Sequence, residues 1–441
     1  YRQSQLPADR QTWVQHVREL HNLYTRKQNL FWETKVRASH GNPKKLWKTL
    51  NSVLCKDRSS GPSSSTGLSA EGFLKAFANK VTNVKASTAA ASDPSFDSPP
   101  VSCSFQKFQA VSAEDIKQCI LVSPDKTSVL DPVPTWLVKQ FVDDLLPFMT
   151  VFINKSLSTG FFPTAYKTAI VTPILKKDNL DSSDYSNYRP ISNLSFMSKI
   201  IERCVNAQLH QYLTTNHLLP DHQSAYRPQN STEMAVLKVL PDTATDKREI
   251  TLLCMLDLSA AFDCVDHQIL LRRLSHSFGI HNTVHTWFNS YLSGRSQRVS
   301  YNGETSDPLP VLYGVPQGSV LGPVLFIIYT AEVMSVITQH GLLVHGYADD
   351  LQVYSHAPPA LLSDLSLRFN QCFEAVEKWM ASNRLKLNPS KTEIIWLGSR
   401  FQLSHCPPGP VNLFNSDIIP STTVRDLGVM IDSELSLNAH I

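Results

Sequence analysis

The sequence predicts an α+β protein in which helices cover an antiparallel sheet. The chain has 441 residues, 42% of them apolar, which is enough for a large core and two or three structural units. Short β-rich runs alternate with segments of helical periodicity. Two apolar runs, residues 342–347 and 351–354, flank the tight turn Ala348-Asp349-Asp350, which is the pattern of an antiparallel hairpin. Together these observations indicate the α+β class.

The N-terminal segment is predicted to be helical. Apolar residues recur at helical spacing from residue 10 to 36, and further helical patches cover residues 44–54 and 70–84. A Ser/Gly/Pro-rich break lies at residues 59–67. Residues 86–104 are rich in Ala, Ser and Pro, which is the composition of a flexible linker. The aromatic stripe of the first helix is interpreted as core packing rather than as a base-stacking platform; its members are Trp13, Tyr24, Phe31 and Trp32.

Charge is distributed unevenly along the chain. The net charge is only +3, yet residues 1–58 carry +8 and the remainder carries −5. A basic arm of this kind is typical of a surface that binds a nucleic-acid backbone. A solvated helix face would have the same composition, and both interpretations stay open.

The segments after the linker are predicted in the following order. Ser112 opens a helix with a capping pattern. The next elements are a strand over residues 167–175, an amphipathic helix over 197–214 and a short apolar strand over 250–256 that ends at Asp257. A helix over residues 266–278 and a β-branched stretch over 297–313 then precede the hairpin.

Cysteine usage and hydropathy bear on the compartment. None of the eight cysteines forms a Cys-x-x-Cys pair, and several lie in apolar runs, so a reduced intracellular environment is predicted. The apolar stretch at residues 320–329 is about half the length that a membrane span needs, so no membrane insertion is predicted. Because the first residue is Tyr1 and Ile441 follows closely on a strand, we expect an internal fragment of a longer polyprotein.

Three acids stand where apolar strands end. Asp257 ends one strand, and Asp349 and Asp350 occupy the hairpin turn. Phosphoryl transfer to a hydroxyl uses two divalent ions held by carboxylates from separate elements, and these acids fit that need. An Asp pair in a hairpin is by itself more often turn chemistry. The Gly/Pro-rich segment 314–319 between the two acid sites strengthens the catalytic interpretation, since such a loop lets the backbone approach a nucleotide.

The motifs and their order resemble the reverse transcriptases of non-LTR (LINE-type) retrotransposons. The matching segments are Lys167–Lys177, Asn187–Ser192, Gln223–Pro228 with Ser231 and Thr232, Leu256–Asp263, Gly314–Pro323, Tyr347–Asp350, Leu387–Thr392 and Leu427–Val429. RNA-dependent RNA polymerases also carry an Asp pair in a hairpin. The aromatic residue at Phe262 and the Pro-Gln-Gly loop favour an enzyme that uses deoxynucleotides.

The resemblance implies a role for each matching residue. Asp257, Asp349 and Asp350 and the carbonyl of Leu258 would bind two Mg²⁺ ions, with Mn²⁺ as the alternative. Phe262 would lie under the sugar and reject a 2′-hydroxyl, unless it is a core residue. Lys176 and Arg189 would clamp the triphosphate, unless they are surface charges. Lys391 would give a proton to pyrophosphate, unless it is a solvated lysine. The remaining assignments are Gln317 and Gly318 near the nucleotide, Gln223, Tyr226 and Arg227 on the template, and Asp263 as a helix cap.

The implied fold is a right-hand polymerase with fingers, an antiparallel palm sheet and a partial thumb. The expected units are a basic helical N-terminal extension (1–85), a linker (86–110), the start of the fingers (111–157), the reverse transcriptase domain (158–428) and a truncated start of the thumb (429–441). Such an enzyme extends a DNA primer on an RNA template with dNTPs by target-primed reverse transcription. An endonuclease domain is expected upstream, and the expected location is a cytoplasmic ribonucleoprotein and the nucleus. The alternative is a non-catalytic, RNA-binding remnant of such an element.

Overall fold

The structure is a computed structural model that describes residues 7–37, 67–96, 101–125, 128–227, 230–242, 249–388, 391–407, 409–413, 416–438 and 440. The chain divides into two compact units, residues 1–67 and 68–441. The predicted helix at residues 44–54 and most of the break at 59–67 lie outside the described residues. In the first unit the described element is helix α1 (Pro7–Arg37), which confirms the first predicted helix.

The apolar stripe of α1 is exposed at its described positions. Trp13 is 58% exposed and Leu20 is 67% exposed. The interpretation of Trp13 as a core residue is therefore wrong. Among the described residues of this unit, no second helix or strand is present against which α1 could bury the stripe. The side chains of Tyr24, Phe31 and Trp32 lie outside the described part.

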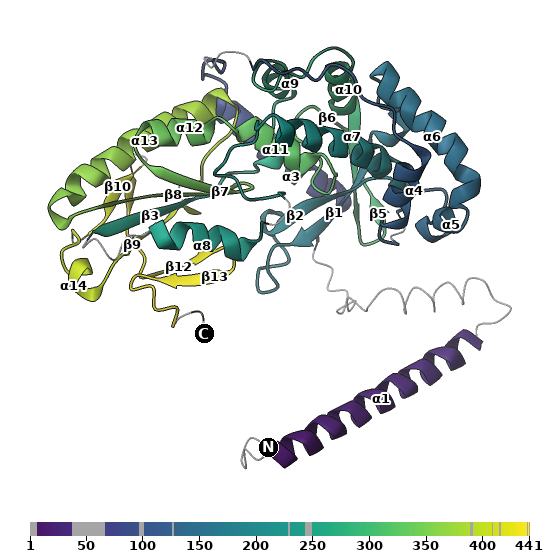
Figure 1. Cartoon of the computed structure of the whole chain (residues 1–441), viewed down its shortest axis with the longest axis horizontal. Coiled ribbons are helices and arrows are strands. Elements are labelled where there is room, and N and C mark those ends of the chain that lie inside the picture. Colours follow the sequence, from purple (N-terminus) through teal and green to yellow (C-terminus); the bar gives the residue numbers. More distant parts are fainter. Residues whose placement is uncertain are drawn as a thin grey trace. The chain divides into compact units, whose positions relative to one another are not determined.

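The second unit holds all other described elements, and its α+β class is confirmed (Figure 1). Its helices are α3 (Ala70–Thr88), α4 (Ala113–Leu121), α5 (Thr135–Gln140), α6 (Val142–Thr159), α7 (Phe196–Thr215), α8 (Thr232–Asp242), α9 (His267–His276), α10 (Asn282–Leu292), α11 (Gly322–Thr330), α12 (Val333–Gln339), α13 (Leu362–Ser382) and α14 (Arg400–Leu403). Short 3-10 turns are η1 (Thr164–Tyr166), η2 (Tyr185–Asn187), η4 (Phe262–Cys264) and η5 (Pro359–Leu361).

The strands form two main sheets and two small hairpins. They are β1 (Thr168–Leu175), β2 (Tyr188–Asn193), β3 (Ile250–Leu256), β4 (Arg295–Tyr301), β5 (Glu304–Thr305), β6 (Leu309–Val311), β7 (Leu343–Tyr347), β8 (Asp350–Ala357), β9 (Glu393–Leu397), β10 (Val411–Leu413), β11 (Ser416–Ile418), β12 (Thr423–Asp426) and β13 (Val429–Asp432). The strands predicted at residues 167–175 and 250–256 and in the 342–354 hairpin are confirmed, as is the helix at 197–214.

The four-stranded sheet has the order β7-β8-β3-β9, and all its pairs are antiparallel. Its two faces are buried against different elements because side chains alternate along each strand. Leu252 and Cys254 of β3 join the main core, which includes α11, α12 and α13. Leu253 of β3 joins a second core with α8 and the β12–β13 hairpin. Figure 1 shows α13 on one side of this sheet and α8 with β12 and β13 on the other.

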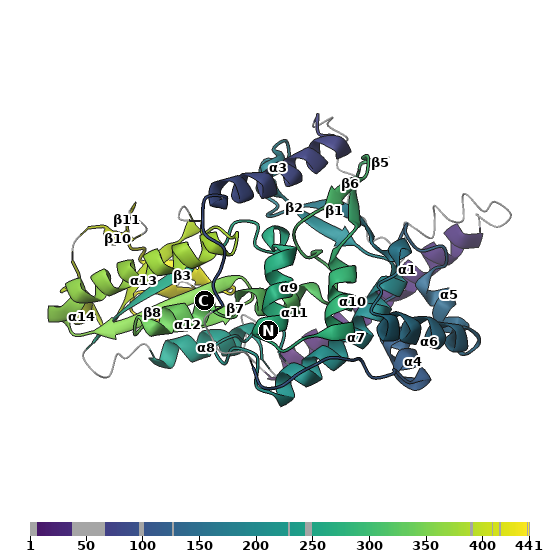
Figure 2. The ribbon, with the colours of Figure 1, turned by 90° about the horizontal axis from the view of Figure 1, so that it is seen from above.

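The five-stranded sheet has the order β2-β1-β4-β5, with β6 also paired to β4. Strands β1 and β4 run parallel although more than a hundred residues separate them, and the other pairs are antiparallel. Helix α3 packs on this sheet, and Figure 2 shows it beside β2, β5 and β6. Phe73 of α3 is fully buried there against Tyr188 and Tyr301.

The boundary between the units differs from the prediction. The sequence places a linker at residues 86–110, whereas the units divide at residue 67 and α3 extends to Thr88. Residues that follow α3 are also held: Phe108 is 4% exposed, and Phe105 exchanges backbone hydrogen bonds with Gly279 and His281. A few aromatic residues hold this segment against the rest of the unit. The average composition of the segment, which is dominated by small residues, does not show their effect.

The apolar segment predicted not to cross a membrane belongs to the core. In the described part of the chain, residues Gly322–Gln339 are long and apolar enough to cross a membrane by length and composition, and 61% of that window is buried inside the protein. The window comprises α11 and α12, and every α11 residue except Pro323 is buried. Packing within the protein therefore accounts for its hydropathy.

Candidate active site

Strand pairing brings the three predicted acids to one edge of the four-stranded sheet. Leu256 of β3 is opposite Leu351 of β8, so the residues that follow and precede them, Asp257 and Asp350, come to the same end. Tyr347 is opposite Asp350, which leaves Ala348 and Asp349 as the turn of the β7–β8 hairpin. Carboxylates from two separate segments of the chain thus meet at this edge.

The acids perturb one another electrostatically. Partial burial and the neighbouring Asp257 raise the pKa of Asp349, while Arg189 and Lys391 lower it. Partial desolvation and then the carboxylates of Asp349 and Asp257 raise the pKa of Asp350 to about 6, although the side chain itself is exposed. A site that gathers negative charge in this way is stabilised by a bound cation.

One cation is supplied by the chain itself. The ammonium of Lys391 lies 2.9 Å from a carboxylate oxygen of Asp257 and is 61% exposed. Lys391 is thus an exposed lysine paired with one of the acids, and its catalytic role stays a prediction. Pro389 and Ser390 of the same motif lie outside the described residues.

The acid site suits a metal ion by the chemistry of its ligand atoms rather than by their arrangement. Across the described segments, no group of three or more His, Cys, Asp and Glu side chains is arranged to hold a metal ion. Asp257, Asp349 and Asp350 nevertheless offer the hard oxygen ligands that Mg²⁺ prefers. In the described part of the chain the Leu258 carbonyl accepts no hydrogen bond, so it is available as a further oxygen donor.

The hairpin turn is held by Gln223. Ala348 has φ of 60°, a left-handed conformation that is unfavourable for a residue with a Cβ. The Gln223 side chain accepts a hydrogen bond from the Ala348 N–H at 3.0 Å and donates one to its carbonyl at 3.3 Å. Gln223 is 2% exposed, so we correct its assignment from template contact to positioning of this turn.

The other two predicted template residues lie next to Gln223. Tyr226 is 49% exposed and close enough to Asp349 for that carboxylate to raise its pKa, after the larger effect of burial. The Arg227 guanidinium donates to the Pro220 carbonyl at 2.6 Å. Tyr226 is thus accessible beside the acids, whereas Arg227 is partly used within the loop. Pro228 lies outside the described residues.

The Gly/Pro-rich loop is fixed to the segment that follows Asp257. Val315 donates to the Phe262 carbonyl at 2.9 Å, and the Gln317 amide donates to both carboxylate oxygens of Asp263 at 2.9 and 3.0 Å. Gly318 has φ of 110°, and a Cβ there would lie 2.6 Å from the Ser192 carbonyl oxygen, so the loop needs glycine to approach β2.

Asp263 does not cap the following helix, which corrects the prediction. Asp266 is the N-cap of α9 and accepts hydrogen bonds from the N–H groups of Gln268 and Ile269. Asp263 instead holds Gln317, and burial raises its pKa to about 6. Both residues are aspartates near a helix start, so the sequence alone does not distinguish them.

Phe262 lies at the boundary between the core and the site. Its ring stacks on Phe326 of α11, with centroids 4.5 Å apart and planes 21° from parallel, and the side chain is partly buried. The two predicted roles are therefore compatible, because one face packs on the core while part of the side chain remains accessible.

The predicted phosphate-binding residues are on the five-stranded sheet. Lys176 follows β1 and donates to the Ser186 carbonyl at 2.6 Å. Burial and then the charges of Lys80, Lys391 and Arg189 lower its pKa. Arg189 on β2 is exposed and lies close enough to Asp349 to lower the pKa of that carboxyl. These basic residues therefore lie within electrostatic reach of the acid site.

Glu202 of α7 is a buried residue that sequence analysis missed. It is 0% exposed and accepts hydrogen bonds from Ser198, Tyr291 and the backbone N–H groups of Val320 and Leu321. It therefore fixes the two residues that lead into α11, where the Gly/Pro-rich loop ends. A Glu inside the apolar face of an amphipathic helix was the available signal.

A buried polar chain connects the acid hairpin to β12. His345 of β7 is hydrogen bonded to Ser224 at 2.9 Å and to Gln352 of β8 at 3.3 Å, and Gln352 donates to Asp426 at 2.5 Å. Asp426 is 3% exposed. The same region has a pocket of about 390 Å³, which Asp257, Asp350, Lys391, Arg425 and Leu427 help to line. Sequence analysis did not anticipate this chain.

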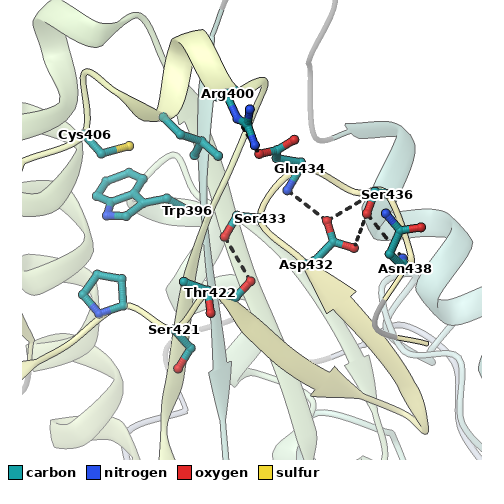
Figure 3. Close-up of a pocket in the computed structure, with 12 residues that line it drawn as sticks. Trp396, Arg400, Cys406, Ser421, Thr422, Asp432, Ser433, Glu434, Ser436 and Asn438 are labelled. Atoms are coloured by element: carbon teal, nitrogen blue, oxygen red, sulfur yellow. Dashed lines mark hydrogen bonds and ion pairs between the residues drawn. The ribbon is translucent and has the colours of Figure 1, made fainter. Parts of the chain in front are cut away.

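A second pocket, of about 670 Å³, contains none of the predicted site residues. Figure 3 shows it between Trp396, Cys406 and the segment that follows β13. Arg400 and Glu434 form an exposed ion pair at 3.5 Å on its wall. Because none of the predicted catalytic or nucleotide-binding residues line it, the pocket beside the acids is the better candidate active site.

Comparison with known proteins identifies the class. The family model for reverse transcriptase (RNA-dependent DNA polymerase) matches residues 174–431, more than half of the chain and the part that contains the acids, the Gly/Pro-rich loop and β12. The chain belongs to this family.

Relatives narrow the class further. The RNA-directed DNA polymerase from mobile element jockey of Drosophila melanogaster is 27% identical over 340 residues, which cover 75% of this chain and 36% of that protein. The probable RNA-directed DNA polymerase from transposon BS of the same species is 27% identical over 461 residues, covering 99% of this chain and 50% of that protein. These relatives confirm the resemblance to LINE-type reverse transcriptases. The chain spans half or less of the length of these two relatives.

Proposed function

We propose that this chain is the RNA-directed DNA polymerase region of a non-LTR retrotransposon protein and extends a DNA primer on an RNA template. The observation that carries the proposal is the convergence of Asp257, Asp349 and Asp350 at one sheet edge, beside Lys391 and inside the segment matched by the reverse transcriptase family. Target-primed synthesis and an endonuclease elsewhere in the longer protein belong to the same proposal.

The proposed division of the molecule follows its sheets. The four-stranded sheet with its covering helices would be the palm, and the five-stranded sheet with α4 to α7 would be the fingers. The boundary expected between residues 428 and 429 falls inside a hairpin, since Asp426 is paired with Val429. The β12–β13 hairpin packs on the palm sheet as one piece, so we place any thumb after it.

Two Mg²⁺ ions are the proposed cofactor, held by Asp257, Asp349, Asp350 and the Leu258 carbonyl, and Mn²⁺ would satisfy the same ligands. When bound, they supply positive charge that activates the primer hydroxyl and neutralises the triphosphate. The convergence of Asp257, Asp349 and Asp350 supports this. Burial is the largest cause of the raised pKa values of Asp349 and Asp350, and the neighbouring carboxylates add to it.

The residues of the chain would divide the remaining work. Arg189 and Lys176 bind triphosphate oxygens, Arg189 with a fork that fits two of them. Phe262 lies under the sugar, and Gln317 and Gly318 support the base pair from a loop fixed to Asp263. The primer 3′-hydroxyl gives its proton to water, and its oxygen forms a bond to the α-phosphorus while the bond from that phosphorus to the leaving pyrophosphate breaks. Lys391 gives the leaving pyrophosphate a proton.

The test is primer extension on an RNA template by the purified chain, with dNTPs or rNTPs and with or without Mg²⁺. We expect Mg²⁺-dependent incorporation of dNTPs, and loss of at least about a thousandfold in Asp257→Ala and Asp349→Ala. The matched control is Asp364→Ala, which removes an exposed aspartate from the first turn of α13 and should leave extension unchanged. If the unchanged chain also binds RNA but extends no primer, the non-catalytic remnant is favoured.

A further inference from the structure

Helix α3 lies outside the segment matched by the reverse transcriptase family, yet it is held at both ends against the catalytic unit. At its start, the Ser69 N–H donates to the Tyr185 hydroxyl at 3.2 Å, and a Cβ at Gly72 would lie 2.1 Å from that hydroxyl. Near its end, Lys85 pairs with Asp266 at 3.0 Å. One anchor is on the five-stranded sheet side and the other is at the start of α9.

The middle of α3 crosses between these anchors. Phe73 and Val84 are buried on the face that packs against the unit. Lys80 is seven residues after Phe73 and four before Val84, so helical geometry puts it on the same face. Lys80 is nevertheless exposed. The ammonium of Lys80 therefore reaches solvent although its neighbours on this face are buried.

The contacts of α3 locate Lys80. The helix contacts η2, whose Ser186 carbonyl accepts a hydrogen bond from Lys176, and η4, which contains Asp263. Lys80 correspondingly lowers the pKa of both Lys176 and Asp263, although burial is the largest influence on each, and Asp263 holds Gln317. It therefore lies between the predicted triphosphate clamp and the Gly/Pro-rich loop. Four cations lie near one another here: Lys80, Lys176, Arg189 and Lys391. The acids near them are Asp184, Asp257, Asp263, Asp349 and Asp350.

We propose that α3 covers the nucleotide site and that Lys80 binds phosphate there, as a further binding residue beside Lys176. Lys80 and Lys176 form no ion pair with an acid in the described part of the chain, and cations of this kind attract a polyanion. The shared chemistry is a phosphate group, which either the triphosphate of the incoming nucleotide or the backbone of the RNA template would provide. Proximity to Lys176 favours the triphosphate. This inference rests on the proposed function.

The matched variants are Lys80→Ala, Lys80→Arg and Lys75→Ala. Lys75 is on the opposite face of α3, where it is 73% exposed and 3.8 Å from Glu71, so it controls for loss of charge and of helix stability. Extension of oligo(dT) on poly(rA) gives KM for dTTP and kcat. Titration calorimetry with a dideoxy-terminated primer gives the Kd of dTTP and of inorganic tripolyphosphate, and filter binding gives the Kd of the primer–template.

We expect Lys80→Ala to raise the KM and Kd for dTTP and the Kd for tripolyphosphate by about five- to tenfold, the effect of one charge-assisted hydrogen bond. Lys80→Arg should restore most of this affinity. Lys75→Ala should match the unchanged chain, and the primer–template Kd should stay within about twofold in all variants.

Two results would overturn the inference. One is nucleotide and tripolyphosphate affinities in Lys80→Ala equal to those of the unchanged chain. The other is a loss confined to primer–template affinity, which would assign Lys80 to the RNA backbone. A chain that extends no primer but binds tripolyphosphate through Lys80 would refute the proposed function alone. A chain that extends primers equally well with and without Lys80 would refute the inference alone.

Discussion

At the scale of single residues, Asp350 links the active site to stability. Its pKa is raised to about 6, above the ordinary aspartate value, so the folded state binds a proton more readily than the unfolded state. The stability that protonation provides is complete below the unfolded pKa and is lost as the pH rises through the folded pKa. At neutral pH the charged Asp350 therefore destabilises the metal-free protein.

We predict that Asp350→Asn raises the melting temperature of the chelated protein at pH 7.5 and that the difference shrinks at about pH 4. Mg²⁺ should then stabilise the unchanged chain more than the variant, because the variant lacks a ligand. Thermal melting at both pH values, with EDTA or with Mg²⁺, measures this. A variant with lower stability than the unchanged chain at pH 7.5 in EDTA would contradict the electrostatic account.

Gln223 provides a second prediction at this scale. In Gln223→Ala the Ala348 N–H loses its partner at a strained turn, so we expect a loss of about 1–3 kcal/mol in stability. Activity should fall as well, because Asp349 follows Ala348 directly. Chemical denaturation and primer extension measure the two effects. Ala348→Gly in the same background should recover part of the stability, since glycine adopts the left-handed conformation freely.

The predictability of these residues was uneven. The acids were predictable because each ends an apolar strand or occupies a hairpin turn, which are local signals. The role of Gln223 was not, since it depends on a contact with a turn more than a hundred residues away. The same holds for Asp263, whose partner Gln317 comes from a distant loop.

At the scale of elements, local periodicity located helices and strands well but not their partners. Strand β3 and helix α7 are found within one or two residues of their predicted bounds. The parallel pairing of β1 with β4 could not be predicted, because nothing in either strand encodes its distant neighbour. The packing of α3 on the second unit was missed for the same reason.

The hydrogen bonds of Glu202, which connect α7 to the segment before α11, can be tested by substitution. Glu202→Ala would leave the N–H groups of Val320 and Leu321 and the Tyr291 hydroxyl unpaired in the core, so we expect a loss on the order of 3 kcal/mol or more. Glu202→Gln keeps an acceptor for the N–H groups and should lose less. Urea denaturation measures the stability of the three proteins, and equal stability of the Ala and Gln variants would refute the role of Glu202 as a buried acceptor.

At the scale of the whole molecule, the two units differ in charge. Residues 1–58 carry +8 and the rest carries −5, so the N-terminal unit is the basic one. The exposed apolar stripe of α1 adds surface that is not used within its own described unit. We interpret the first unit as the backbone-binding part and the second as the catalytic part.

Truncation separates these contributions. A chain that starts at Leu68 should keep the melting temperature of the second unit but bind RNA more weakly, with a flatter dependence of log Kd on log salt concentration. A chain that starts at Ala89 also lacks Phe73, so its aromatic cluster is disrupted and we expect a loss of about 3–5 kcal/mol. Calorimetry and filter binding at several salt concentrations measure both. An unchanged salt dependence in the first truncation would favour a merely solvated helix face.

The central position of β3 has a consequence for synthesis on the ribosome. Strand β3 pairs with β8 and β9, and both follow it by about a hundred residues or more. The nascent chain therefore carries an apolar strand with two unpaired edges until most of the domain has emerged. A partial product of translation that ends before β8 therefore exposes this apolar strand and is prone to aggregate. On the proposed function, such a product also lacks Asp349 and Asp350 beside Asp257.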